Sequence, residues 1–305
     1  MVGYVVKKLL ITIPLLLFIS IAIFAIIHLA PGDPVSLTVN PGAPQSVFAA
    51  QRVRLGIDKP IPIQYLYFMG RVLHGDLGQS VLTGTNVTTL IGQRLPNTIE
   101  LGVTALALSY VVAIPLGAVA ALRRGKVTDH AAMTVAHIGM GVPDFWLGLM
   151  LVLFFSLYLG WLPSAGNDNW RSLILPTIAL SAQGVAISAR VMRSALLEVL
   201  GQDFVRTLRA KGLSERAVLG HALRNALLPS ISLFGLRLGW LIGGAVIVET
   251  VFAWPGVGRL LVDSVLHRDY PVVQGVALML GASVILANLL GDVLYAVANP
   301  RVRLG

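Results

Sequence analysis

The sequence predicts an all-α membrane protein with six transmembrane helices, and three observations lead to that class. Of the 305 residues, 56% are hydrophobic and only 12% are charged, whereas about a quarter of the residues of a soluble domain are charged. The mean hydropathy is +0.80. The apolar residues also gather in runs of about 20, which is the length that a helix needs to cross the hydrocarbon core.

The six predicted spans cover residues 9–30, 101–122, 132–159, 173–189, 230–251 and 273–297. The first run follows two lysines, as a secretory signal does. It is longer than a signal core and ends in Pro31-Gly32-Asp33-Pro34 without a cleavage pattern, so we expect a retained anchor. The fourth run is the most polar, and we expect its helix to continue past Arg190 into the cytoplasm.

The distribution of Lys and Arg sets the expected orientation, because cytoplasmic segments carry the excess of basic residues. With the N-terminus inside, the inner segments hold 14 of these residues and the outer segments hold 8, while Arg237 lies within the fifth span. Both termini are therefore expected in the cytoplasm.

The connections between the spans suggest three parts. Residues 1–30 form the cytoplasmic N-terminus and first helix, residues 31–97 a small extracytoplasmic unit, and residues 98–305 a five-helix core with a cytoplasmic loop at 190–228. The extracytoplasmic unit is either a cap over the helix ends or a docking surface for a soluble partner, and the pattern leaves both open.

Composition disfavours several other classes. The net charge is +9, but the basic residues are spread between apolar runs, which is not the pattern of a nucleic-acid-binding patch. The absence of cysteine excludes disulfides and thiolate metal ligands. The six histidines lack paired ligand spacing, and we expect His28 and His137 to be core or interface residues.

The cytoplasmic loop has a pattern of its own between residues 202 and 216. It predicts two short helices broken at Gly212, because glycine permits a sharp turn or a positive φ. Ser214 is placed to cap the second helix, in which residues 217–223 supply an apolar face. On pattern alone, a helix pair lying on the membrane surface is the alternative.

Motifs in this loop resemble the membrane subunits of ABC-type importers, which carry a Glu-Ala-Ala-x-x-x-Gly pattern and a later Leu-Pro ending. Gly212 matches the glycine, and residues 221–229 match the ending. Arg206-Thr207-Leu208 departs from Glu-Ala-Ala but is similar to the Arg-Thr-x-x-Ala-Lys-Gly version of one branch, the dipeptide, oligopeptide and nickel permeases. Similar signatures of that branch lie at residues 29–34, 75–80, 160–163, 252–259, 268–271, 292–295 and 299–303.

The resemblance implies a permease subunit in a bacterial inner membrane. Its implied partners are membrane lipid, a second homologous permease subunit, two cytoplasmic ATP-binding subunits and an extracytoplasmic substrate-binding protein. The chain has no Gly-x-x-x-x-Gly-Lys-Ser/Thr loop, so ATP and Mg are expected on the partner subunits and no cofactor on this one. The implied cargo is a dipeptide or oligopeptide, with a nickel or metal chelate or glutathione as the alternative.

The resemblance also implies which residues dock on the ATPase. We expect residues 210–216 to form a coupling helix, braced by Pro229. The implied docking residues are Arg206, Ala210, Lys211, Gly212, Leu213, Ser214, Glu215, Arg216, His221, Arg224, Asn225 and Pro229.

Polar residues and glycines inside the spans are candidates for the translocation path or for helix packing. Charged groups in spans are costly and usually face protein or water, so Asp144 lines the path or bonds a neighbouring span, and Arg237 either pairs with Asp292 or extends to the interface. The full candidate set is Asp144, Gln183, Arg237, Gly235, Gly239, Gly243 and Asp292. A secondary transporter is the rival class, but it would be expected to show internal repeats and several intramembrane acids.

Overall fold

The computed structural model describes residues 2–29, 44–46, 48–50 and 58–298, some of them by their backbone alone. The longer helices are α1 (Val2–Leu29), α4 (Val87–Leu122), α7 (Ile174–Leu200), α9 (Glu215–Val251) and α11 (Tyr270–Ala298). The shorter ones are α3 (Ile61–Leu73), α5 (Val127–Gly141), α6 (Asp144–Leu151), α8 (Asp203–Ala210) and α10 (Val257–Leu266), together with a π-helix at Val152–Tyr158 and a 3-10 turn at Trp170–Leu173. No strand forms among these residues, so the all-α prediction is confirmed.

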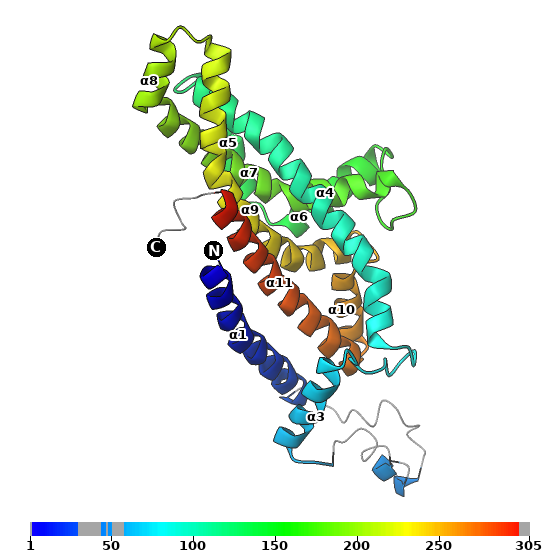
Figure 1. Cartoon of the computed structure of the whole chain (residues 1–305). Helices are drawn as coiled ribbons and strands as arrows, with labels where there is room; N and C mark the ends of the chain where they lie inside the picture. Colours follow the sequence, from blue (N-terminus) through cyan, green and yellow to red (C-terminus); the bar gives the residue numbers. More distant parts are fainter. Residues whose placement is uncertain (1, 30–43, 47, 51–57, 299–305) are drawn as a thin grey trace.

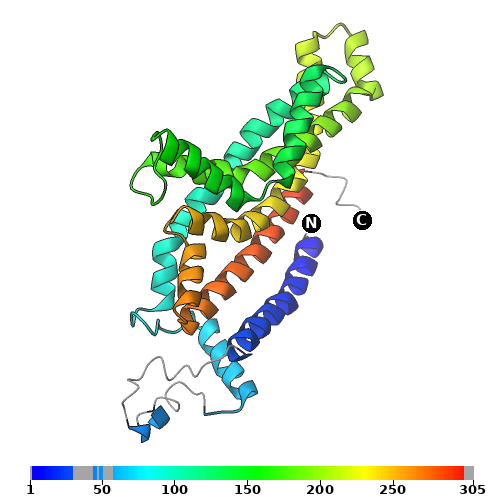
Figure 2. The ribbon, with the colours of Figure 1, turned by 180° about the vertical axis from the view of Figure 1, so that it is seen from behind.

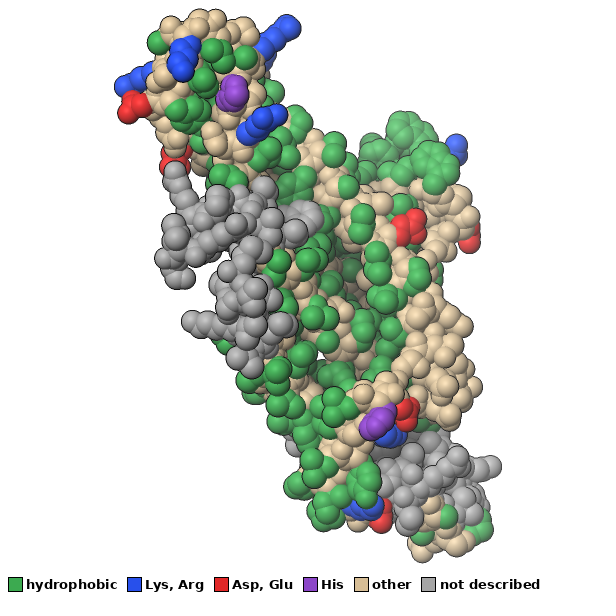
Figure 3. All heavy atoms as spheres, viewed as in Figure 1, with side chains coloured by type: hydrophobic (Ala, Val, Ile, Leu, Met, Phe, Trp, Pro, Cys, Tyr) green, Lys and Arg blue, Asp and Glu red, His purple; other side chains and the backbone are tan. Residues whose placement is uncertain are grey.

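The helices form an elongated bundle (Figure 1). α4 packs against α7, α7 and α11 pack against α9, and α1 lies along α11. The hairpin of α8 and α9 projects from one end of the bundle, and α3 lies at the other end, as both views show (Figure 2). On the face in Figure 3, charged side chains gather at these two ends and on the projecting connection before α7, while hydrophobic side chains cover the stretch between.

Three helices of the described part are long and apolar enough to cross a membrane: Val87–Leu122, Trp170–Leu200 and Tyr270–Gly291. A fourth crossing is the pair Val127–Gly141 and Asp144–Tyr158, if the two count as one broken span. The predicted spans at 101–122, 173–189 and 273–297 therefore lie in helices that meet this test. A shorter apolar helix covers Ile11–Ala25, inside the predicted first span.

The predicted third span, 132–159, is not one straight helix. Its two halves are bent by 104° at a break before Asp144. Pro143 causes the break, because proline disfavours helical dihedrals in the residue before it and Val142 is extended, with ψ 121°. The bend leaves the predicted crossing at 132–159 either one broken span or two short helices.

The loop predicted at 190–228 is largely helical, with the end of α7, all of α8 and the start of α9 inside it. α7 continues past Arg190 to Leu200, as predicted, and α9 starts at Glu215. The second short helix of the loop and the predicted fifth span are thus one helix of 37 residues, which contains Pro229 and changes direction along its course (Figures 1 and 2).

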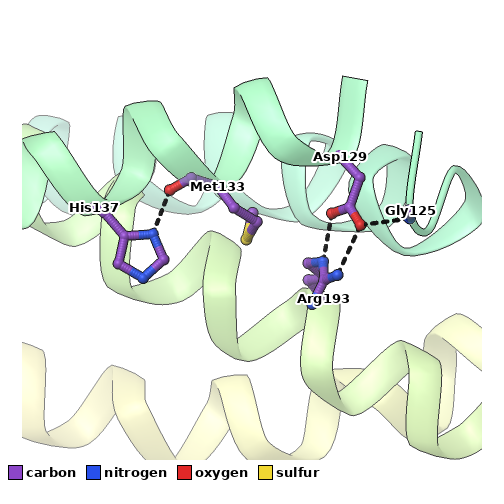
Figure 4. A network of polar contacts seen from close by, with 5 residues as sticks. All are labelled: Gly125, Asp129, Met133, His137 and Arg193. Atoms are coloured by element: carbon purple, nitrogen blue, oxygen red, sulfur yellow. Dashed lines mark hydrogen bonds and ion pairs between the residues drawn. The ribbon is translucent and has the colours of Figure 1, made fainter. Parts of the chain in front are cut away.

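A buried carboxylate ties α5 to its neighbours at the α8 end of the bundle (Figure 4). Asp129, only 2% exposed, accepts hydrogen bonds from Nε and Nη2 of Arg193 on α7 at 2.6 and 2.7 Å. It also accepts one from the backbone N–H of Gly125 at 2.9 Å, in the turn that follows α4. One side chain therefore joins α5, α7 and the α4–α5 turn.

At the opposite end, two of the recognised motifs meet although they are far apart in the sequence. Asp269 is buried and accepts hydrogen bonds from the hydroxyl of Ser80 at 2.5 Å and the N–H of Val81 at 3.1 Å. These contacts fix the 75–86 segment to the turn before α11.

Candidate functional site

The α8–α9 hairpin is anchored to the bundle by its apolar side. Val205 is fully buried, and Phe204 packs against a cluster of buried residues from α4, α7 and α9 that includes Met192, Leu196 and Ala222. The strongly amphipathic pattern of α8 explains this placement, since its apolar residues face the bundle and its charged residues face away.

The tip of the hairpin is a turn, not a helix, which corrects the expected coupling helix at 210–216. α8 ends at Ala210, and Gly212 has φ +79°, a conformation that residues with a Cβ rarely adopt. Ser214 caps α9, as predicted, with its hydroxyl accepting a hydrogen bond from the N–H of Ala217 at 3.4 Å. A helix is excluded because the positive φ of Gly212 reverses the chain direction here.

An ion pair closes the turn. Arg209 donates from Nε and Nη2 to the two carboxylate oxygens of Glu215, at 2.8 and 3.1 Å. These hydrogen bonds lower the pKa of Glu215 and raise the pKa of Arg209. The pair thus links the end of α8 to the first turn of α9 at the base of the loop.

Most of the predicted docking residues form one exposed surface on this hairpin. Leu213 is half-buried and the other eleven are exposed: Arg206, Ala210, Lys211, Gly212, Ser214, Glu215, Arg216, His221, Arg224, Asn225 and Pro229. Val218, Ala222 and Ala226 of the same helix point inward and are buried. Pro229 also lines a pocket of about 390 Å³ between α7 and α9, with Arg190, Val191, Ser194, Ala195 and Glu198.

Three of the predicted path residues come together inside the bundle. Arg237 of α9 is 8% exposed and donates from Nη2 to the backbone carbonyl of Gln183 on α7 at 3.1 Å. Its charge also interacts with the carboxylate of Asp144 and with Tyr110 of α4. The side chain of Asp292 lies outside the described residues, so its pairing with Arg237 stays a prediction.

Gly235, Gly239 and Gly243 of α9, spaced four residues apart, do not share one environment. A Cβ at Gly239 would lie 2.7 Å from Oδ1 of Asn288, so this glycine permits close packing on α11, whereas nothing lies within 4 Å of a Cβ at Gly243. For Gly235, the structure describes the helical backbone but not its surroundings. Two close approaches missed by sequence reasoning join α4 and α7, where a Cβ at Gly117 or Gly184 would overlap the facing helix.

Sequence reasoning also missed Glu249, which is fully buried. Its carboxylate accepts hydrogen bonds from the hydroxyl of Thr98 at 2.7 Å and from the N–H of Arg259 at 3.0 Å. Gly256 and Gly258 leave room for this carboxylate, since a Cβ at either position would overlap it. The signal was present: an acid next to the Pro255-Gly256 turn motif at the end of a span.

No group of three or more His, Cys, Asp or Glu side chains in the described part is arranged to hold a metal ion. His137 bonds the backbone carbonyl of Met133, one turn earlier in the same helix (Figure 4). The side chain of His28 lies outside the described residues. The arrangement as a whole combines apolar helices, internal polar groups and a projecting basic hairpin.

Comparison with solved structures first gives the class of fold. Two structures of the methionine ABC transporter MetNI in inward-facing conformations match this fold, with TM-scores of 0.59 and 0.58. Each match covers 69% of this chain and 96% of that chain, at 19% and 20% sequence identity. The fold is therefore that of an ABC transporter component.

Comparison of sequences then gives the family. Residues 113–304 match the family described as binding-protein-dependent transport system inner membrane component, and residues 1–102 match the N-terminal family of such membrane components. The chain belongs to this family and is the permease subunit of an ABC importer, not a catalytic chain. The resemblance seen in its motifs is confirmed.

Individual relatives match over nearly the whole chain. The glutathione transport system permease protein GsiC of Salmonella typhimurium (strain LT2) is 43% identical over 304 residues, which is 99% of each chain. The protein of the same name from Escherichia coli (strain K12) is 42% identical over the same length.

Proposed function

We propose that this permease subunit imports glutathione or closely related short peptides. The observation that carries the proposal is the identity of 43% over 99% of the chain to a glutathione permease. Glutathione is a tripeptide, so this cargo lies within the peptide class that the motifs imply and makes one of the alternatives specific.

We further propose that the α8–α9 hairpin is where the ATPase docks. The Arg209–Glu215 ion pair links the two ends of its exposed tip, and the Ser214 cap begins α9 directly after it. Its apolar side packs on α4, α7 and α9, so a movement of the tip is passed to helices of the bundle. The proposed assembly contains a second permease, two subunits that bind ATP and Mg, and an extracytoplasmic binding protein.

The proposed topology has six crossings: α1, α4, the bent pair of α5 and α6 with the π-helix, α7, α9 and α11. The basic residues of the hairpin support a cytoplasmic position for that end, namely Arg206, Arg209, Lys211, Arg216 and Arg224. Both termini then face the cytoplasm. The proposed division keeps an extracytoplasmic unit at 31–97 and a permease core at 98–305.

Reconstitution tests the cargo. The complete importer, isolated through a tag on this subunit, is placed in liposomes with ATP inside and its binding protein outside, and uptake of labelled glutathione is measured. Excess unlabelled glutathione should abolish uptake of the label, whereas a nickel chelate should not compete. Uptake of nickel or of an unrelated dipeptide in preference to glutathione would overturn the proposed cargo.

Co-purification tests the docking surface. A double variant Arg216→Glu and Arg224→Glu places acids on the exposed face of the hairpin and should reduce recovery of the ATPase subunits without loss of the second permease. The control is Arg171→Glu, an exposed arginine on the connection before α7. Equal recovery of the ATPase with both variants would contradict docking at this surface.

A further inference from the structure

Polar groups from four helices, some of them backbone carbonyls, lie around Arg237 within the apolar bundle. The hydroxyl of Tyr110 on α4 donates to the carbonyl of Ser230 on α9 at 3.2 Å. The charge of Arg237 interacts with both Tyr110 and Asp144, and Arg237 donates to the carbonyl of Gln183 on α7. Asp144 stands at the start of α6, directly after the 104° break.

Two buried polar atoms of this cluster lack a hydrogen-bond partner among the described residues. Oδ1 of Asp144 and Oγ of Ser230 are buried, and neither has a hydrogen-bond partner among the described residues. Leaving such a buried group unsatisfied costs about 1–3 kcal/mol, and more when it is charged. Most buried polar atoms in proteins have partners, so an unsatisfied carboxylate oxygen inside a span indicates that something else binds there.

The position of Arg237 leaves that oxygen available. Its charge interacts with the Asp144 carboxylate, yet no hydrogen bond or ion pair joins these two side chains among the residues that the structure describes. Burial disfavours the ionised form of Asp144, and the positive charge of Arg237 opposes that effect without occupying the carboxylate oxygens. Oδ1 is buried, but Asp144 as a whole is only half-buried, so part of the residue is open to a molecule outside the chain, whereas Arg237 is almost fully covered.

We propose that Asp144 binds the ammonium group of the transported peptide during its passage through the membrane, with Arg237 as the positioning residue. A carboxylate inside a low-dielectric bundle selects a cation, and the free amino terminus is the cation that every unmodified short peptide carries. Ionisable residues within spans commonly mark such substrate paths. The inference rests on the proposed function, since it takes a peptide as the cargo.

Accessibility is the first test, and the chain suits it because it has no cysteine. Asp144→Cys introduces a single thiol into the assembled importer, and Leu149→Cys is the matched control, because Leu149 lies on the same helix with its side chain 48% exposed. Both are treated with a water-soluble cationic methanethiosulfonate, with and without ATP and glutathione-loaded binding protein. The thiol at position 144 should react, and glutathione should slow its reaction at least about fivefold, while the reaction rate of the control thiol should not change with glutathione.

Charge is the second test. In the reconstituted importer, Asp144→Asn should reduce the glutathione imported per ATP hydrolysed by about tenfold while the ATPase stimulated by the binding protein is retained. Asp144→Glu, which restores the charge, should recover most of that ratio. A purely structural role predicts that the ATPase falls with uptake and that Glu, being larger, rescues no better than Asn.

The outcomes separate the two proposals. A wild-type importer that takes up no peptide overturns the proposed cargo. A wild-type importer that takes up glutathione, together with an unreactive or unprotected thiol at position 144 or an unchanged ratio in Asp144→Asn, overturns the role of Asp144 alone. If Asp144→Asn does not assemble, the reactivity and protection of the thiol at position 144 decide whether Asp144 binds the peptide.

Discussion

Gly212 offers a direct test of the hairpin, because its role depends on backbone conformation. Its φ of +79° lies in the left-handed region, where a residue with a Cβ costs about 1–2 kcal/mol more than glycine. Nothing lies within 4 Å of a Cβ placed there, so the cost of Gly212→Val comes from the backbone alone. That cost corresponds to a factor of about 5–30 in the ratio of native to non-native turn.

The assay is peptide uptake per ATP hydrolysed in the reconstituted importer. We expect Gly212→Val to lower this ratio by up to about 5–30-fold, with normal assembly of the subunit, because the turn is exposed and remote from the core. Gly212→Asn should stay near wild type, since asparagine tolerates left-handed dihedrals. Gly220→Ala is the control: it is exposed within α9, its φ is negative and nothing lies within 4 Å of its Cβ.

Two results would refute the reasoning. A Gly212→Val importer with the wild-type ratio would show that the turn geometry does not matter for coupling. A Gly212→Asn importer that fails as badly as Gly212→Val would show that lack of a side chain, rather than the left-handed backbone, is what position 212 requires.

Glu249→Ala leaves two buried donors without an acceptor, at about 1–3 kcal/mol each, so the melting temperature in detergent should fall by several degrees. Glu249→Gln keeps one acceptor oxygen, so its melting temperature should fall less. Arg193→Ala leaves the buried Asp129 carboxylate without its arginine and should also lower the melting temperature, and the double exchange Arg193→Asp with Asp129→Arg should restore part of the loss. Because the pKa of Glu215 is lowered by Arg209, their ion pair is fully present above the ordinary pKa of about 4.3 and is lost as pH falls through the lower folded value. A spin label on the turn should therefore keep constant mobility from about pH 8 to pH 5 and loosen only in stronger acid; loosening between pH 7 and 6 would contradict this assignment.

Local signals of turns and caps could be read from the sequence. Gly212 and Ser214 do what their residue types predict, because a positive φ and an N-cap depend on the residue itself and its nearest neighbours. The extension of α7 past Arg190 could be predicted too, since no glycine or proline interrupts it before Gly201.

Features that depend on residues distant in the sequence could not be read. Hydropathy gives the length of the run at 132–159 but not the 104° bend, because the angle depends on what the two halves pack against. The charge interaction between Asp144 and Arg237 joins residues on α6 and α9, and nothing in the local sequence around either residue specifies it. The position of Glu249 at the end of a span could be read from the sequence, but its hydrogen-bond donors could not, since they come from α4 and α10.

The carboxylate of Asp129 has a mechanical consequence. Asp129 bonds both α7 and the α4–α5 turn. While these bonds hold, the part of α5 that carries Asp129 cannot rotate separately from α7 and that turn. Relative motion along the same chain must then be absorbed where the backbone is not helical, at Val142 and Pro143. Proline fixes its own φ, so the freedom of this joint is reduced to very few dihedral angles, and α6 has a narrow set of directions in which it can swing.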